Sequence, residues 1–184
     1  MLSYEEIYKV VEKKLSEKRF YHSKCVVERC IEYAKIYGVD VDKMKIAGIV
    51  HDIAKEMKLE ESLELAEEYK VQLDEVEKNH NPLIHAKLGA EIAKIDFGCT
   101  EDICESIKWH TTGKENMSLM EKILFIADAT SADRKYEDTE KIYSMAKENL
   151  DKAIFLVLKE CIIDVIEKDL PIHLDSIKAY NSMI

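Results

Sequence analysis

The sequence contains few of the residues that interrupt regular structure. Only 5 of its 184 residues are glycine and 2 are proline, which leaves little turn punctuation for a protein of many strands. Apolar residues make up 47% of the chain and charged residues 35%, a composition that favours long helices. The sequence therefore predicts an all-α fold. A chain of this length can bury a sizeable core in one domain, so we expect residues 1–184 to form a single compact helical bundle.

The sequence also lacks an excess of positive charge. A formal net charge of −10 and a pI near 5.2 argue against a general nucleic-acid or membrane-surface binder, which would need a basic face. No run approaches the ~20 apolar residues that a membrane span requires, and the acidic amino terminus has no signal-peptide pattern. We therefore predict a cytoplasmic protein with neither nucleic-acid nor membrane partners.

The cysteines are few, and their spacing does not suggest a metal-binding or redox pair. The 5 cysteines include no Cys-x-x-Cys pair, which indicates reduced cytosolic thiols. Cys25, Cys30 and Cys161 lie on apolar helical stripes, so we expect their side chains to be buried. They give no support to a cysteine nucleophile.

Three common signatures of nucleotide binding and hydrolysis are missing from the sequence. There is no Gly-x-x-x-x-Gly-Lys-Ser/Thr loop, no Gly-x-Gly-x-x-Gly turn and no Gly-x-Ser-x-Gly elbow. P-loop binding, Rossmann binding and serine-hydrolase chemistry therefore have no support, and a phosphate ligand must be held in another way.

Apolar residues recur at helical spacing along most of the chain. With capping residues as boundaries, we predict helices over 4–18, 22–37, 41–54, 81–95, 100–110 and 118–128, peripheral helices at 60–69 and 72–78, further helices at 138–148 and 151–168, and a short closing segment after Pro171. The helix over 41–54 has almost no polar face and is expected to be central.

Residues of the metal-ligand type fall at the ends of these predicted helices. They are His22, His51, Asp52, His85, His110 and Asp128. His22 is expected in the first turn of its helix, and the His51-Asp52 pair in the last turn of the central helix. His80, in a loop ahead of Pro82, and His173, in the tail, are expected to lie outside this set.

Neutral imidazoles and carboxylates suit first-row divalent metals such as iron, manganese, cobalt or zinc, whereas magnesium or calcium sites use mainly oxygen ligands. Six such ligands fit two metal ions, which can share a bridging carboxylate and a bridging hydroxide. We predict Asp52 as the bridge, with His22, His51 and Asp128 on one metal and His85 and His110 on the other. This arrangement suits hydrolysis of phosphate esters or anhydrides.

Cationic and small polar residues near these positions are candidates for binding phosphate. They are Arg19, Lys55, Thr111, Thr112, Gly113 and Arg134. Lys55 follows Asp52 by three residues and would share its face if the helix continues, and the arginines offer forked donors. The alternative for the charged residues is a solvated face, and for Thr111-Thr112-Gly113 a plain helix stop.

Several segments of the chain carry a family resemblance. They are residues 17–23, His51-Asp52-Ile53-Ala54-Lys55, residues 83–90 with their Leu-x-His-Ala-x-x-Gly-Ala pattern, residues 107–113 with the His-Thr-Thr-Gly turn, and residues 126–128. In these segments the sequence resembles the HD phosphohydrolase superfamily and, within it, the YqeK family of bacterial proteins. The likeness runs over most of the chain.

The resemblance implies a compact all-helical HD fold with a dinuclear iron-type centre that hydrolyses diadenosine tetraphosphate symmetrically to two ADP. On that template the ligands are His22, His51, Asp52, His85, His110 and Asp128, with Lys55, Thr111 and Arg134 near phosphate. The family usually continues from the aspartate with a Glu-Pro pair before its arginine, whereas this chain has Ala129-Thr130-Ser131-Ala132-Asp133 before Arg134.

The predicted function is metal-dependent hydrolysis of a dinucleoside polyphosphate, with Asp52 and Lys55 as catalytic residues. Hydrolysis of another nucleotide, such as a deoxynucleoside triphosphate or a cyclic dinucleotide, stays open as an alternative. So do a non-catalytic nucleotide or alarmone sensor and a di-iron oxygenase. The acidic helix at 60–69 could serve as a lid or as the contact of a homodimer.

Overall fold

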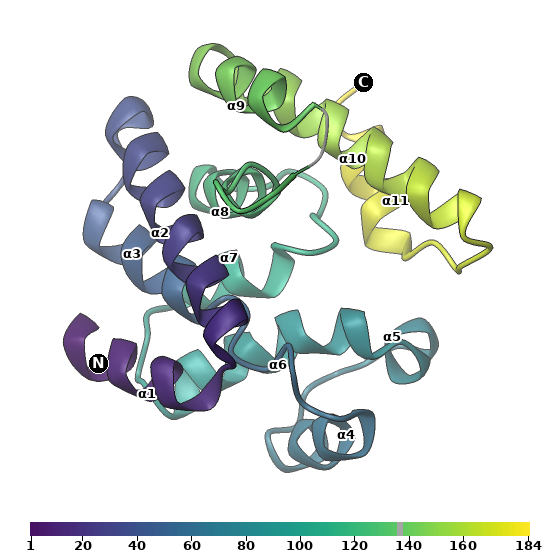
Figure 1. The fold of residues 1–184 in the computed structure, drawn as a ribbon. Helices are drawn as coiled ribbons and strands as arrows, with labels where there is room; N and C mark the ends of the chain where they lie inside the picture. Colours follow the sequence, from purple (N-terminus) through teal and green to yellow (C-terminus); the bar gives the residue numbers. More distant parts are fainter. Residues whose placement is uncertain (136–137) are drawn as a thin grey trace.

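A computed structural model of the protein describes residues 1–135 and 138–184, which in these ranges fold into helices and loops without a strand (Figure 1). The helices are α1 (Tyr4–Lys14), α2 (Glu17–Tyr37), α3 (Val41–Val50), α4 (Leu59–Glu68), α5 (Glu75–Asn79), α6 (Asn81–Ile95), α7 (Glu101–Trp109), α8 (Leu119–Ala129), α9 (Thr139–Glu148), α10 (Leu150–Glu167) and α11 (Leu174–Asn181). The predicted all-α class is confirmed, and the helix predicted to reach Ile95, with Asn81 as its N-cap, corresponds to α6, whose N-cap is His80.

Helix α3 is the central element of the fold. It packs against α1, α2, α7 and α8, and its residues Ile46–Val50 are all buried. The other helices extend from this centre: α4 and α5 pack on α6, and α9 and α11 pack on α10. In Figure 1, α4–α6 lie below the central helices and α9 and α10 lie above them. The expectation of a central helix is confirmed.

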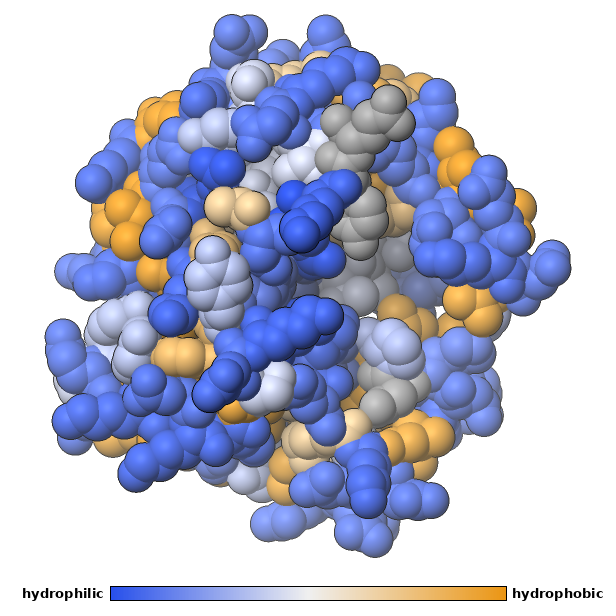
Figure 2. Space-filling model, viewed as in Figure 1, coloured by the Kyte–Doolittle hydropathy of each residue, from blue (hydrophilic) through white to orange (hydrophobic). Residues whose placement is uncertain are grey.

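Polar residues cover most of the face shown in Figure 2, with apolar groups in separate patches. Within residues 1–135 and 138–184, none of the helices combines the length and the apolar character needed to span a membrane.

Gly48 sets the distance between α2 and α3. A Cβ atom at this position would lie 3.2 Å from the Cα of Val27 and 3.3 Å from the Sγ of Cys30. The first neighbour is backbone, which cannot rotate away as a side chain could. The two helices that carry His22 and His51 are therefore this close because residue 48 has no side chain.

We expect Gly48→Ala to destabilise the protein. Alanine favours a helix over glycine by about 1 kcal/mol, but overpacking a tight core costs about 1–3 kcal/mol. A net loss of about 1 kcal/mol in the free energy of unfolding should appear in urea titrations. Gly89→Ala is the matched control, because its Cβ would meet neighbours only at 3.4 Å and beyond. A Gly48→Ala protein as stable as the Gly89→Ala protein would contradict this account.

The predicted first helix, 4–18, is too long. Helix α1 ends at Lys14, and Ser16 caps α2 by accepting a hydrogen bond from the backbone of Arg19 at 3.2 Å. Ser16 is itself fixed by Glu56, which accepts hydrogen bonds from its backbone nitrogen and its hydroxyl. Since α2 begins at Glu17, His22 lies in its second turn. The prediction that His22 lies in the first turn is therefore wrong.

The predicted central helix, 41–54, also ends earlier, at Val50. From there the backbone bonds connect residues three apart, from Ile53 N to Val50 O and from Lys55 N to Asp52 O. Such bonds close tighter turns than an α-helix. His51 is therefore the C-cap residue of α3, and Asp52 lies just beyond the helix instead of in its last turn.

A cluster of charged residues connects α5 with the start of α11. The Nε2 atom of His173 lies 3.0 Å from Asp74 and 3.5 Å from Glu77, while its Nδ1 accepts a hydrogen bond from Asp175 N. An Nδ1 that accepts leaves the ring proton on Nε2, facing the carboxylates. The Nζ of Lys87 lies 2.6 Å from Oε1 of Glu77, the same oxygen that faces His173. With the proton on Nε2, His173 faces Asp74 and Glu77 as a neutral donor, and Lys87 forms the ion pair with Glu77.

We expect Glu77→Gln to lower stability by about 2 kcal/mol at neutral pH, because it removes a charge-assisted hydrogen bond. Burial acts to raise the pKa of Glu77, but His173 and Lys87 outweigh it and lower the pKa from 4.5 to about 2. A lowered pKa stabilises the fold above about pH 4.5, and this contribution is lost as the pH falls towards about 2.

The measurement is urea unfolding of both proteins at about pH 7 and about pH 3.5, where the stability gap between them should narrow. Glu75→Gln, on the exposed side of the same helix, is the control. A gap that does not change with pH would contradict the assignment.

Candidate metal centre

Three buried histidines are held by the backbone in the same way. His51, His85 and His110 each donate from Nδ1 to the carbonyl oxygen three residues earlier in the chain. The acceptors are Gly48, Pro82 and Ile107, at 2.8, 2.7 and 2.6 Å. A carbonyl oxygen can only accept, so Nδ1 carries a proton, and in the neutral ring each Nε2 keeps its lone pair. These lone pairs are available to a metal.

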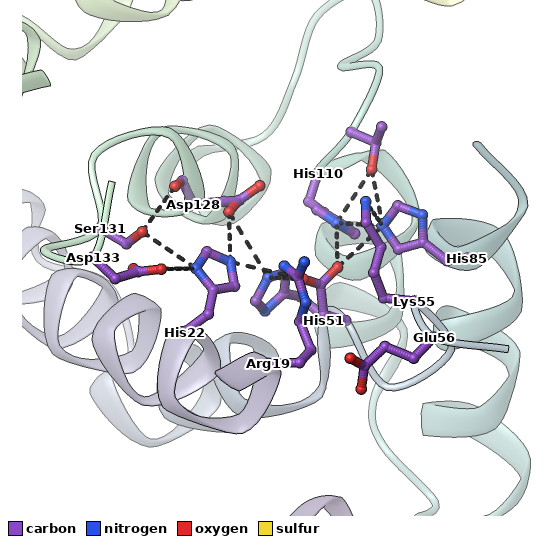
Figure 3. Close-up of polar contacts among 12 residues, drawn as sticks. Arg19, His22, His51, Lys55, Glu56, His85, His110, Asp128, Ser131 and Asp133 are labelled. Carbon is purple, nitrogen blue, oxygen red and sulfur yellow. Dashed lines mark hydrogen bonds and ion pairs between the residues drawn. The ribbon is translucent and has the colours of Figure 1, made fainter. Parts of the chain in front are cut away.

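His22 has the same tautomer but a different partner. Its Nδ1 lies 2.9 Å from Oδ2 of Asp133, and burial, which acts to raise the pKa of Asp133, is outweighed by Ser131 and His22, which lower it. The carboxylate is therefore an acceptor, and Nδ1 donates to it. On the other side of the ring, Nε2 lies 3.0 Å from Oδ1 of Asp128. Figure 3 shows His22 between these two carboxylates.

Asp52 lies between two groups of histidines. Its Oδ2 is 3.7 Å from Nε2 of His22 and 3.4 Å from Nε2 of His51. Its Oδ1 is 3.2 Å from Nε2 of His85 and 3.7 Å from Nε2 of His110. Each oxygen of one carboxylate thus faces a different pair of imidazoles, and the structure brings together the six predicted ligands.

The residues present fit a bound metal. The Nε2 atoms of His22 and His51 are buried and have no hydrogen-bond partner. Nε2 of His22 and Oδ1 of Asp128 face each other at 3.0 Å, although both atoms are acceptors. Buried acceptors without a donor are costly, and a cation would satisfy them. At this centre two groups have ligand atoms close enough for one ion: His22, His51 and Asp128, and His51, Asp52 and His110.

The ionisation states suit the same role. Burial acts to raise the pKa of Asp52, but His51 and contacts with His110 and His85 outweigh it and hold the pKa well below its usual range. Burial lowers the pKa of His85 to about 3 and lowers the pKa of His110 as well. The carboxylate is therefore charged and these two imidazoles neutral at neutral pH, as metal ligands require.

Two arginines contact the carboxylates of the centre. Arg19 donates from Nη1 to Oδ2 of Asp52 at 2.8 Å. Arg134 donates from Nε to the backbone carbonyl of Asp128 at 3.1 Å, and its Nη2 contacts the Asp128 side chain. Arg19 reaches the centre from α2, three residues before His22, whereas Arg134 reaches it from the segment that follows α8. Both were predicted at this place.

Lys55 reaches the other half of the centre although α3 does not continue to it. Its Nζ lies 3.2 Å from Nε2 of His85, and Figure 3 shows the side chain pointing at His85 and His110. Burial lowers the pKa of Lys55 below its ordinary value, although Asp52 acts in the opposite direction. Thr111 joins this group, because its Oγ1 lies 3.2 Å from Nε2 of His110.

Thr112 and Gly113 are not brought to the centre. The hydroxyl of Thr112 donates to the carbonyl oxygen of Gly113 at 2.9 Å. A Cβ at Gly113 would meet Ala179 of α11 and Leu158 of α10, so this side of the glycine faces the protein core. Of the predicted polar turn, only Thr111 faces the histidines in this structure.

A cavity of about 430 Å³ opens beside the centre. Lys55, His110, Thr111, Asp128 and Arg134 line one end of it. The rest of the wall comes from α8, α9 and α10 and includes Phe125, Ile142, Val157, Glu160, Cys161 and Asp164. Cys161 was expected to be buried in the core, and this prediction is wrong, since it lies exposed on α10.

A family model of the HD domain matches residues 19–133 of the chain. The protein belongs to the HD-domain family. The matched range begins at Arg19, ahead of the first candidate ligand, and ends at Asp133, after the last one.

Relatives and a solved structure agree with this assignment. The chain is 36% identical to the symmetrical bis(5'-nucleosyl)-tetraphosphatase of Halalkalibacterium halodurans, over 95% of this chain and 94% of that protein. It is 31% identical to the enzyme of the same name from Bacillus subtilis, over 98% and 97%. A crystal structure of an HD superfamily hydrolase involved in NAD metabolism from Clostridium acetobutylicum matches with a TM-score of 0.95 and 35% identity, over 100% of this chain and 97% of that one.

The HD fold and the phosphohydrolase class expected from the sequence are therefore confirmed. HD domains depend on metal, and this one has histidine and aspartate groups able to bind it. The identity and number of the metal ions and the role of each residue stay predictions.

The sequence did not reveal two parts of this HD domain. One is Asp133, whose only signal was its place in the segment that departs from the YqeK pattern. The other is the cavity wall, for which no local signal exists, because Phe125, Ile142 and Val157 belong to three different helices and look like ordinary core residues.

In the metal-free HD domain we expect the His85 ring to stay neutral down to about pH 5. Its pKa of about 3 lies below the ordinary value of 6.5 because the ring is buried. NMR of the imidazole Cε1 proton should show no titration of His85 between about pH 7.5 and about pH 5. The same protein unfolded in urea is the control, and its histidines should titrate near the ordinary value. A His85 midpoint near that value in the folded protein would contradict the assignment.

Proposed function

We propose that this HD domain hydrolyses diadenosine tetraphosphate symmetrically to two ADP. The observation that carries the proposal is Asp52, whose two carboxylate oxygens face two separate pairs of imidazoles. This geometry suits a carboxylate shared by two metal ions. The relatives named symmetrical bis(5'-nucleosyl)-tetraphosphatase, which match nearly the full chain, support the choice of substrate.

One metal would be held by His22, His51 and Asp128 and the other by His85 and His110, with Asp52 between them. When bound, such a pair supplies a nucleophile at neutral pH and a clamp on phosphoryl oxygens. Imidazole and carboxylate ligands suit iron, with manganese, cobalt and zinc as alternatives. The Nδ1 hydrogen bonds of the four histidines would hold the ligands in orientation without further rearrangement.

The hydrolysis consumes one water and breaks the central phosphoanhydride bond. The water oxygen bonds to one of the two inner phosphorus atoms, and the bridging oxygen leaves with the other ADP. Lys55 and Arg134 line the end of the cavity nearest the centre, and Arg19 lies on its Asp52 side. These three cations would neutralise charge on non-bridging oxygens, with Thr111 donating from its hydroxyl.

The cavity supports a nucleoside next to the phosphates. Its volume of about 430 Å³ falls within the range of small-molecule sites, and Phe125, Ile142 and Val157 give it apolar walls. Glu160 and Asp164 on α10 line the same cavity and offer acceptors for amino or hydroxyl groups. The cysteines of the described residues are free thiols, as is usual in the reducing cytosol. Together with a nucleotide substrate, this supports a cytoplasmic location.

The test is turnover of diadenosine tetraphosphate by protein loaded with Fe²⁺ or Mn²⁺, with chromatography of the products. ADP should be the sole product. Asp52→Ala should lose metal together with activity, by more than about a hundredfold in kcat/KM. Asp42→Ala, which removes an exposed carboxylate at the start of α3, the helix that precedes Asp52, is the control and should keep both. Full activity of Asp52→Ala would exclude this mechanism.

Other results would identify the alternatives. AMP and ATP as products would exclude symmetrical cleavage. Binding of the nucleotide without product would indicate a sensor. Oxygen consumption in place of phosphate chemistry would indicate an oxygenase.

A further inference from the structure

The four histidines of the centre differ in what holds them. His51, His85 and His110 each donate from Nδ1 to a carbonyl oxygen of their own chain segment, three residues earlier. These partners belong to the backbone, so no side-chain substitution removes them. His22 is the exception, because it lies inside α2 and its Nδ1 partner is a side chain 111 residues further on, Asp133.

The contact between Asp133 and His22 is close and shielded from solvent. Nδ1 lies 2.9 Å from Oδ2 and 3.2 Å from Oδ1 of the carboxylate. The side chain of His22 is 4% exposed and that of Asp133 is 23% exposed. Ser131 lies nearby, with its Oγ 3.5 Å from the same nitrogen. Figure 3 shows Asp133 and Ser131 on the side of His22 that faces away from the other histidines.

The contact decides which nitrogen of His22 faces the centre. With Nδ1 donating to Asp133, Nε2 keeps a lone pair, and this atom lies 3.0 Å from Asp128 and 3.7 Å from Asp52. Without the acceptor, the ring could carry its proton on Nε2, where Asp128 would accept it, and in that tautomer Nε2 cannot bind a metal.

We propose that Asp133 is a positioning residue of the metal centre: its carboxylate holds His22 in the tautomer and orientation that bind metal. The inference rests on the proposed function in that it takes His22 as a ligand. It assigns a role to the segment Ala129–Asp133, which departs from the YqeK pattern. The segment begins at the last residue of α8, which carries Asp128, so the end of this helix supplies one ligand and the loop after it orients another.

The role is confined to one half of the centre. Asp133 contacts His22, which faces Oδ2 of Asp52. His85 and His110 face Oδ1 and have their own backbone partners. Loss of the carboxylate should therefore weaken the binding of one metal ion and leave the binding of the other unchanged.

The experiment measures Mn²⁺ binding by calorimetry for the wild type, Asp133→Ala and Asp133→Asn. Removing the hydrogen-bond partner of a ligating histidine lowers metal affinity by about 10–100-fold. Asp133→Ala should therefore lower the affinity for one of the two ions by this factor. Asn keeps an oxygen acceptor at the same place, so Asp133→Asn should recover most of the affinity. Asp42→Ala, far along the chain and exposed, should bind both ions as the wild type does.

A second readout is the ¹⁵N spectrum of the His22 ring in the metal-free protein, which a general loss of stability would not change. The wild type and Asp133→Asn should carry the proton on Nδ1, and Asp133→Ala should shift it towards Nε2. Two-ion binding by Asp133→Ala with wild-type affinities, or an unchanged His22 tautomer, overturns the inference. Failure of the wild type to bind Mn²⁺ would instead overturn the proposed function.

Discussion

The buried carboxylate of Asp52 is the constraint on which the arrangement of this protein depends. Its side chain is 4% exposed, and a charged group this far from water is stable only when other groups compensate its charge. Imidazoles from α2, α3, α6 and α7 surround it. The fold brings these helices to one point, and the tight turn after Val50 places the carboxylate there rather than on the face of α3.

The ligand positions could be predicted from the sequence, because helix ends carry local signals and ligand-type residues stand out in an apolar context. The helix boundaries around them could not. Ser3 and Glu6 form a capping box within four residues, whereas Ser16 has Arg19 at the corresponding position and is fixed by Glu56, 40 residues away. The start of α2, and hence the place of His22 in its second turn, depends on that tertiary contact.

A periodic apolar stripe also does not tell how far the core reaches. The stripe of α10 continues to its end, but its buried residues stop at Leu158. Cys161 follows this point and is exposed. Asp133 illustrates the same limit, since a charged loop residue acquires a role only when the loop lies against α2.

The acidic composition and a polyanionic substrate are compatible because charge is distributed unevenly. The net charge is −10, yet beside the centre Arg19, Lys55 and Arg134 stand against the carboxylates of Asp52, Asp128 and Asp133. The three positive and three negative formal charges balance, so bound divalent ions would give this point an excess of positive charge. A compact polyphosphate can place its charge there, whereas a long polyanion would also meet the acidic surface around it.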